Sequence, residues 1–254
     1  MRFFDCNCCI GLPANPASPT AGVSPGVSAG GLLAAMDRAG IDRALLWHVG
    51  QLDQDPLTGN DLLAEAIAAH DRLVGVWSLL PPQTGELGDV GEWFKRAASA
   101  GVRACRAFPE ANRYLLRAEV FEEVFEAMTA ARWPLLLSLA RGVRWDQIYD
   151  LLGEFPKLTV ILCDHGSWGA DRYFRPLLQR HPNVYVEIGG YTLDGGIEDF
   201  VARYGPGRML FGSNFPACHH GGMMLALAHA EISDADKQAI AAGNLERLLG
   251  EVKL

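Results

Sequence analysis

Short apolar runs alternate with amphipathic segments from one end of the chain to the other. Eight runs have the length and β-rich composition of buried strands, namely residues 3–10, 43–49, 73–80, 102–108, 134–140, 159–165, 184–189 and 209–213. Each run is followed by a loop, and most are followed by an amphipathic segment. Eight strand–helix units in 254 residues predict a single α/β domain over residues 1–254, a (β/α)8 TIM barrel. An open doubly wound sheet is the alternative, but no Gly-x-Gly-x-x-Gly motif follows an early strand.

Local signals place several helices. Residues 58–61 (Thr-Gly-Asn-Asp) precede an apolar helical stretch in the manner of a capping box. Residues 118–131 carry apolar side chains at helical spacing, and Ser233 is placed to cap the last helix.

The segment 12–31 interrupts this rhythm. It is rich in Gly, Pro, Ala and Ser and contains no charged residue. Because it follows the first strand, it would lie at the C-terminal face of a barrel, where active sites form, and a long loop there is often a lid. A surface insertion without fixed structure is the alternative.

Composition and charge narrow the function only broadly. The net charge is -8 and no basic stripe occurs, so neither nucleic acid nor a membrane surface is an expected partner, whereas a small-molecule substrate is. The apolar segments are too short to span a bilayer, and the N-terminus lacks a secretory signal. Three of the six cysteines crowd the first strand, which is no disulfide framework, so we expect a cytoplasmic protein.

The first strand carries the most informative chemistry. Strand alternation predicts that Asn7 and Cys9 share one face, while Cys6 and Cys8 share the other and pack in the core. A His-x-His pair at positions 7 and 9 would hold a metal ion. Asparagine is a poor zinc ligand, and Cys9 alone cannot hold the ion.

Five motifs in order resemble the amidohydrolase-related family, of the amidohydrolase 2 type, in the branch that includes aromatic-acid decarboxylases and lactone hydrolases. Residues 5–11 stand where the family has Asp-x-His-x-His-x-Gly, and residues 209–216 stand where it has a strand ending Phe-Gly-Ser-Asp-Tyr-Pro. The other three motifs are residues 60–81, 161–166 and 240–249. The resemblance covers nearly the whole chain. It implies a TIM barrel that acts on a small molecule, and it leaves a homodimer open, because relatives are often dimers.

The resemblance also implies where the family's metal ligands would stand. Carried over residue by residue, those positions are Asn7, Cys9, Ser138 and Asn214, and all four differ from the family's ligands. Because a zinc site needs three or four good donors and negative charge, we expect no metal cofactor at these positions.

His165 matches the family's strand-six histidine, which lies at the reaction centre. We therefore predict that His165 is the acid or base of a metal-free reaction. Cys9 is a candidate nucleophile if it lies within hydrogen-bond reach of His165. Packing in the space left by a lost histidine is the alternative role for Cys9.

The remaining candidates are polar residues near predicted strand ends. Asn214 replaces a carboxylate and is expected to position substrate, in the catalytic set with His165 and Cys9. Arg106 lies on the face of Ala104 and is a candidate carboxylate anchor, with a structural ion pair as the alternative. Asn7, Ser138 and His48 complete the predicted substrate-binding set.

A second metal arrangement stays open. Cys218, His219 and His220 follow the eighth predicted strand. Together with Cys9 and His165, His219 or His220 could form a relocated metal site, although the spacing fits no standard zinc motif.

Two functions follow from these candidates. The first is an amidohydrolase-like hydrolase or lyase that acts without the usual metal on a small carboxylated or cyclic substrate. The second is a catalytically inactive pseudoenzyme that keeps the pocket for ligand binding or regulation, because fold does not fix function.

Overall fold

A computed structural model describes residues 1–14 and 26–253 of the chain. Within them, eight parallel strands follow one another around a nearly closed barrel in the order β1 to β8. The predicted (β/α)8 TIM barrel is therefore confirmed, and all eight predicted strands are present. The strands are β1 (Phe4–Ile10), β2 (Arg43–His48), β3 (Leu73–Ser78), β4 (Val102–Ala107), β5 (Leu135–Ser138), β6 (Val160–Cys163), β7 (Val184–Glu187) and β8 (Met209–Leu210).

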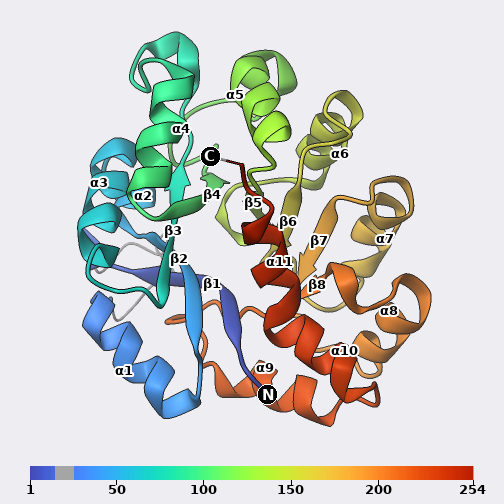
Figure 1. The fold of residues 1–254 in the computed structure, drawn as a ribbon. Helices are drawn as coiled ribbons and strands as arrows, with labels where there is room; N and C mark the ends of the chain where they lie inside the picture. The colour runs from blue at the N-terminus through green and yellow to red at the C-terminus, as the bar shows by residue number, and fades with distance from the viewer. Residues whose placement is uncertain (15–25, 254) are drawn as a thin grey trace.

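Helices surround the barrel (Figure 1). The α-helices are α1 (Ala29–Ala39), α2 (Gly50–Asp53), α3 (Pro56–Ile67), α4 (Val90–Ser99), α5 (Ala118–Ala131), α6 (Trp145–Glu154), α7 (Asp171–Arg180), α8 (Gly196–Tyr204), α9 (Gly221–His229), α10 (Asp234–Gln238) and α11 (Asn244–Gly250). The short 3-10 helices are η1 (Pro82–Thr84), η2 (Leu139–Arg141) and η3 (Pro206–Arg208), and η4 (Ala239–Gly243) is a short π-helix. None of the described helices is both long enough and apolar enough to cross a bilayer.

Helix starts follow from local capping. Residues 118–131 form α5 as predicted, and Ser233 caps α10 by accepting a hydrogen bond from the Asp236 amide. The start of α3 differs from the prediction. Asp55, not Thr58, is the N-cap, and its carboxylate accepts from the Thr58 amide at 2.7 Å. Asp followed by Pro at the first helical position is the stronger start signal, which moves the helix start upstream.

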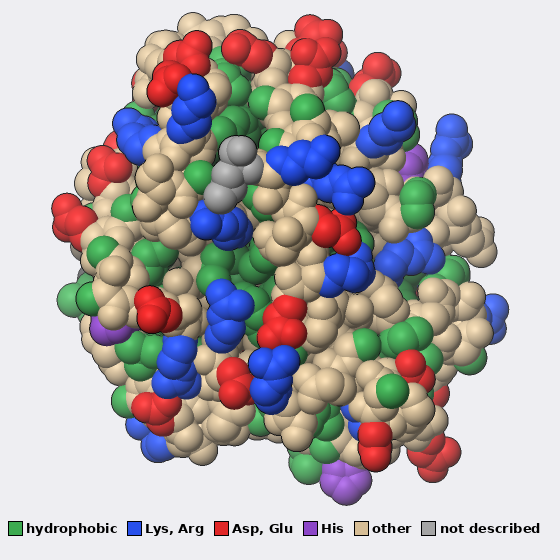
Figure 2. All heavy atoms as spheres, in the orientation of Figure 1, with side chains coloured by type: hydrophobic (Ala, Val, Ile, Leu, Met, Phe, Trp, Pro, Cys, Tyr) green, Lys and Arg blue, Asp and Glu red, His purple; other side chains and the backbone are tan. Residues whose placement is uncertain are grey.

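Apolar side chains form two buried layers. One layer fills the barrel interior and includes Cys6, Cys9 and Phe108, and the other lies between the strands and the helices and includes Cys8 and Cys105. At one end of the barrel, α11 lies across the opening, where Leu245 joins the interior layer (Figure 1). Figure 2 shows this face of the molecule, on which acidic and basic side chains are interspersed.

The predicted alternation of β1 is wrong for Cys6. The pairing register of β1 with β2 shifts between Asp5 and Cys8, so Cys6 packs inside the barrel together with Cys9. Cys8 packs outside, in the layer beneath the helices. An irregularity of this kind breaks the two-residue period, which the sequence pattern alone does not reveal.

The predicted lid or insertion at 12–31 falls largely outside the described residues. Its ends are ordered by backbone contacts, since the Gly11 amide donates to the Val27 carbonyl at 2.8 Å. The helix α1 already begins at Ala29, with Ser28 as its N-cap.

Candidate functional site

A buried polar network crosses the barrel interior. Its members are Asn7 of β1, Arg106 of β4, Ser138 of β5, Asp164 after β6 and Glu187 of β7, and we call this set the interior polar network. Four of these residues are at most 1% exposed, and the Asp164 side chain is 4% exposed. Charged groups so deeply buried need partners, and the network supplies them.

The Arg106 guanidinium lies between Asn7 and Asp164. Its Nη1 donates to Asn7 Oδ1 at 2.9 Å, and its Nη2 donates to Asp164 Oδ2 at 3.2 Å. Both the oxygen and the nitrogen of the Asn7 side-chain amide form hydrogen bonds, because Nδ2 donates to Asp164 Oδ1 at 2.9 Å. Ser138 also donates its hydroxyl to Asp164. The carboxylate of Asp164 is therefore held by a cation, an amide and a hydroxyl.

Asp164 reaches the interior because the chain turns at the end of β6. Its φ is 53°, in the left-handed region that Asp tolerates better than most residues. The turn directs Asp164 into the barrel and places His165, the next residue, against Phe174 and Tyr191, with ring centroids 5.2 and 5.9 Å away.

Glu187 is the most perturbed acid of the network. Burial, followed by the nearby negative charge of Asp164, raises the pKa of Glu187 to about 8. Its Oε2 accepts from the Asp164 amide at 3.2 Å, and its Oε1 accepts from the Gly189 amide. Glu187 therefore changes its protonation near neutral pH inside a closed core.

Two glycines make room for the Glu187 side chain. A Cβ at Gly212 would lie 2.5 Å from both Cγ and Oε1 of Glu187, and a Cβ at Gly189 would lie 2.0 Å from Oε1. Both distances are shorter than van der Waals contact, and the walls around them are tightly packed. Any side chain at these positions would displace Glu187.

We predict that Gly212→Ala lowers the free energy of unfolding by about 1–3 kcal/mol, because the added methyl group overpacks the core at Glu187. Urea denaturation of wild type and variant measures the change. Gly207→Ala is the matched control, since a Cβ at Gly207 meets no atom within 4 Å. Equal losses in both variants would show that the contact with Glu187 is not the cause.

Aromatic side chains cover the Arg106 end of the network. The guanidinium lies 5.0 Å from the Trp47 ring centroid and 5.5 Å from that of Phe108. Arg141, from η2, lies over the same Trp47 ring at 4.8 Å. Burial and then the Arg106 charge lower the pKa of Arg141. Arg141 was not among the predicted site residues. Its position in η2, directly after β5, is the feature of the sequence that could have indicated it.

Cys9 and His165 make separate contacts. Cys9 Sγ lies 3.5 Å from the Ile10 carbonyl oxygen, and burial raises the pKa of its thiol to about 12, against the opposing effect of Arg141 and Arg106. His165 Nε2 lies 2.8 Å from the Glu187 carbonyl oxygen, which can only accept, so Nε2 carries the hydrogen. Burial lowers the pKa of His165. Cys9 is thus a neutral thiol and His165 a neutral imidazole at pH 7.

The other predicted residues lie around the C-terminal ends of the strands. Asn214 follows β8 with a φ of 57°, and its carbonyl accepts from the Cys218 amide at 3.1 Å. His48 ends β2, and its Nδ1 accepts from the Gly50 amide at 3.0 Å. Of the predicted substrate-binding set, the structure brings Asn7, Arg106 and Ser138 together around Asp164, and it does not place His48 in that network.

The four family metal positions present a poor donor set in this chain. Asn7 and Ser138 already bond to Arg106 or Asp164. The guanidinium also brings a positive charge within 2.9 Å of Asn7 Oδ1. Neutral donors that are already engaged in hydrogen bonds are poor ligands for a divalent ion, and the expectation that no ion binds at these positions stays a prediction.

Comparisons with known proteins agree with this fold. The amidohydrolase family model Amidohydro_2 matches residues 7–250, whereas a search of curated proteins found no match. A 2,6-dihydroxybenzoate decarboxylase from Rhizobium is 16% identical with a TM-score of 0.71, covering 98% of this chain and 99% of that chain. A 5-carboxyvanillate decarboxylase from Novosphingobium aromaticivorans, with bound manganese and 3-methoxy-4-hydroxy-5-nitrobenzoic acid, is 17% identical with a TM-score of 0.73, covering 98% and 97%.

A third similar structure is a probable 2-pyrone-4,6-dicarboxylic acid hydrolase from Acinetobacter baumannii with citric acid bound. It is 15% identical with a TM-score of 0.71, covering 98% of this chain and 100% of that chain. At such identities the structural likeness shows the fold alone. The family match spans nearly the whole sequence, and the chain therefore belongs to the amidohydrolase family that Amidohydro_2 describes.

Proposed function

We propose that the chain is an amidohydrolase-type hydrolase or lyase that acts on a small carboxylated or cyclic molecule without a divalent ion at the family's metal positions. The observation that carries the proposal is the Arg106 guanidinium, which bonds to Asn7 at one former ligand position and shares Asp164 with Ser138 at another. A fixed cation in a dry interior stabilises developing negative charge more strongly than it would in water.

The family supports the substrate class. The similar structures include decarboxylases of aromatic acids and a probable hydrolase of a pyrone dicarboxylic acid. The compounds for which these enzymes are named are all small carboxylated ring compounds. The same class is the natural one to test on this chain.

His165 is the proposed proton acceptor. Because Nε2 donates to the Glu187 carbonyl, the lone pair is on Nδ1, a buried atom of the ring. Tyr191, an edge neighbour of His165, also lines a cavity of about 510 Å³ between the loops after β7 and β8. That volume lies within the usual range for small ligands.

A specific observation also favours the second candidate, a ligand-binding pseudoenzyme. Asn214 cannot take up a proton, and the Cys9 thiol has a pKa of about 12. Neither residue can activate a nucleophile at neutral pH as it stands. Binding without turnover is the result that this candidate predicts.

The cysteines favour a reducing compartment. All six are free, and five of them are buried. A cytoplasmic location therefore stays part of the proposal. A homodimer is also proposed, and sedimentation analysis of the purified chain would test it.

The test uses 2,6-dihydroxybenzoate and 2-pyrone-4,6-dicarboxylate as probes, with protein kept in excess EDTA. We expect a ligand-dependent rise in melting temperature and a slow change in ultraviolet absorbance of one probe. His165→Asn should lower that rate at least about 100-fold, because it removes the proton acceptor. His70→Asn, a change outside the site, should keep the rate.

Each outcome decides between the candidates. Binding with no turnover favours the pseudoenzyme. Turnover that EDTA abolishes and Mn²⁺ restores contradicts the metal-free reaction. Failure of both probes to bind contradicts the substrate class.

A further inference from the structure

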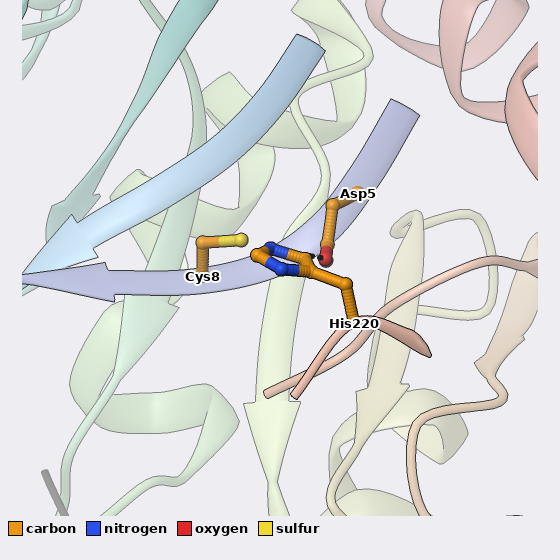
Figure 3. A group of neighbouring side chains, drawn as sticks. All are labelled: Asp5, Cys8 and His220. Atoms are coloured by element: carbon orange, nitrogen blue, oxygen red, sulfur yellow. Dashed lines mark ion pairs between the residues drawn. The ribbon is translucent and has the colours of Figure 1, made fainter. Parts of the chain in front are cut away.

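A second polar cluster lies on the outer side of β1. Asp5 and Cys8 come from β1, and His220 comes from the loop before α9 (Figure 3). One carboxylate oxygen, the thiol sulfur and one ring nitrogen all lie within 4.8 Å of one another. The three residues are 0%, 0% and 3% exposed.

The irregularity in β1 creates this cluster. The register shift between Asp5 and Cys8 brings both side chains to one side of the strand, although regular alternation would separate residues three apart. Asp5 Oδ1 is fixed by the Asn7 amide at 3.0 Å and the Ser213 amide at 3.1 Å. The other oxygen, Oδ2, is therefore held toward His220.

Two buried polar atoms of the cluster face each other without a hydrogen bond. Asp5 Oδ2 and His220 Nε2 are 3.7 Å apart, and neither has a hydrogen-bond partner within the described chain. The His220 ring is stacked on Phe215, with centroids 4.5 Å apart and planes at 16°, which holds Nε2 in place. A buried polar atom without a hydrogen bond destabilises the fold, so an additional partner for these two atoms is expected.

We propose that Asp5, Cys8 and His220 bind one divalent transition-metal ion, with Zn²⁺ as the best match. Oxygen, sulfur and nitrogen donors together are typical of zinc. Burial and the neighbouring Asp5 raise the pKa of the free Cys8 thiol, so binding of the ion would release the thiol proton to solvent. The Asp5 carboxylate and the resulting thiolate balance the charge of the ion. Tetrahedral zinc places its donors roughly 3.3–3.6 Å apart. The Asp5–His220 distance of 3.7 Å is already close to this, and all three pairs of donor atoms lie within 4.8 Å.

The proposed site is distinct from the family's metal positions. Cys8 packs in the layer beneath the helices, whereas Cys9 packs inside the barrel. A cavity of about 380 Å³, lined in part by Val27, Phe215 and His220, lies on the His220 side of the cluster. The inference does not depend on the proposed function.

The position of the cluster suggests what the ion does. The barrel closes between β1 and the β8 region through the Cys6–Phe211 and Cys9–Phe215 backbone hydrogen bonds, of 2.9 and 2.8 Å, and β8 has only two residues. An ion shared by β1 and His220 would join the two sides of this seam. Its binding should therefore raise the melting temperature.

The test titrates the full chain with Co²⁺, a spectroscopic substitute for Zn²⁺. We expect one ion per chain, a thiolate-to-cobalt charge-transfer band and the visible bands of tetrahedral cobalt. Cys8→Ser and His220→Gln should lose the charge-transfer band or the tetrahedral bands, respectively. Cys218→Ser is the matched control and should keep both, because Cys218 is exposed and outside the cluster.

Several results would overturn the proposal. These are no cobalt uptake by the wild type, a charge-transfer band that survives in Cys8→Ser, and a band that disappears in Cys218→Ser or Cys9→Ser instead. If Cys8→Ser does not fold, the wild-type spectrum and a Zn²⁺-dependent rise in melting temperature still decide the matter. Turnover that EDTA abolishes equally in wild type and in Cys8→Ser would depend on an ion bound elsewhere, and it would contradict the proposed metal-free function without bearing on this site.

Discussion

Replacing Arg106 with methionine should lower the free energy of unfolding by about 3–5 kcal/mol. The change takes the guanidinium away from the Asp164 carboxylate in the barrel interior and leaves the hydrogen bonds from Asn7 and Ser138. Arg106 is fully buried, so water cannot replace its charge. Urea denaturation followed by circular dichroism measures the loss.

A double variant separates the ion pair from packing. Arg106→Met with Asp164→Asn removes both charges, and we expect it to recover a substantial part of the stability lost in Arg106→Met alone. Arg103→Met is the control on the same strand. Arg103 donates to the Ala98 and Val102 carbonyls at the barrel exterior, so its loss should cost about 1 kcal/mol. A single variant as stable as wild type would show that the pair does not hold the interior together.

The barrel and the direction of Arg106 were predictable from the sequence because both depend on regular repeats. Eight strand-length apolar runs define the fold. β4 shifts register against β3 between Val102 and Ala104, but it alternates regularly from Ala104 onward, so Arg106 follows Ala104 and Phe108 into the interior. The family match adds evidence of a different kind, since it rests on motifs along the whole chain.

The rest of the site depends on departures from regularity. Cys6 faces the interior and Asp5 joins Cys8 because of the register shift in β1. The chain turns at Asp164, whose φ is 53°. Because of this turn, the Asp164 side chain points into the barrel and His165 contacts aromatic side chains. A two-residue period cannot reveal either feature, and both are set by contacts with residues far along the chain.

Contacts between residues that lie far apart in the sequence could not be predicted either. His220 meets Asp5 across 215 positions of sequence, and Arg141 meets Trp47 from a different strand end. From the sequence, His220 is a candidate metal ligand, but with Cys9 and His165 as its partners. The structure places Asp5 and Cys8 beside it instead, and whether a metal binds there stays a prediction.

Stability should fall as pH rises from about 4.5 to about 8 because of Glu187. Burial raises its pKa from 4.5 to about 8 in the folded chain. The folded state therefore holds a proton that the unfolded state releases over this range. The contribution of Glu187 is complete below pH 4.5 and is lost as pH passes through about 8. One pKa unit corresponds to about 1.4 kcal/mol, so the loss should reach roughly 3–5 kcal/mol.

Glu187→Gln should flatten this part of the pH dependence. The test compares the slopes of stability against pH and not the absolute stabilities. Both carboxylate oxygens of Glu187 accept backbone amide hydrogen bonds, and the amide nitrogen of glutamine would lose one of them, so the variant is also less stable for this second reason. Glu126→Gln, on the exposed side of α5, is the matched control and should keep the wild-type slope. Urea denaturation at pH 5, 6, 7 and 8 measures all three proteins.

The comparison of slopes tests the interior polar network itself. Asp164 is the second cause of the raised pKa of Glu187, after burial. Asp164→Asn should therefore lower that pKa and move the fall in stability to lower pH, with burial still keeping it above 4.5. A wild-type slope that Glu187→Gln leaves unchanged would mean that Glu187 is ionised throughout this range. In that case the buried carboxylates of Asp164 and Glu187 would both carry charge, with the Arg106 guanidinium between Asn7 and Asp164 as the cation that offsets them.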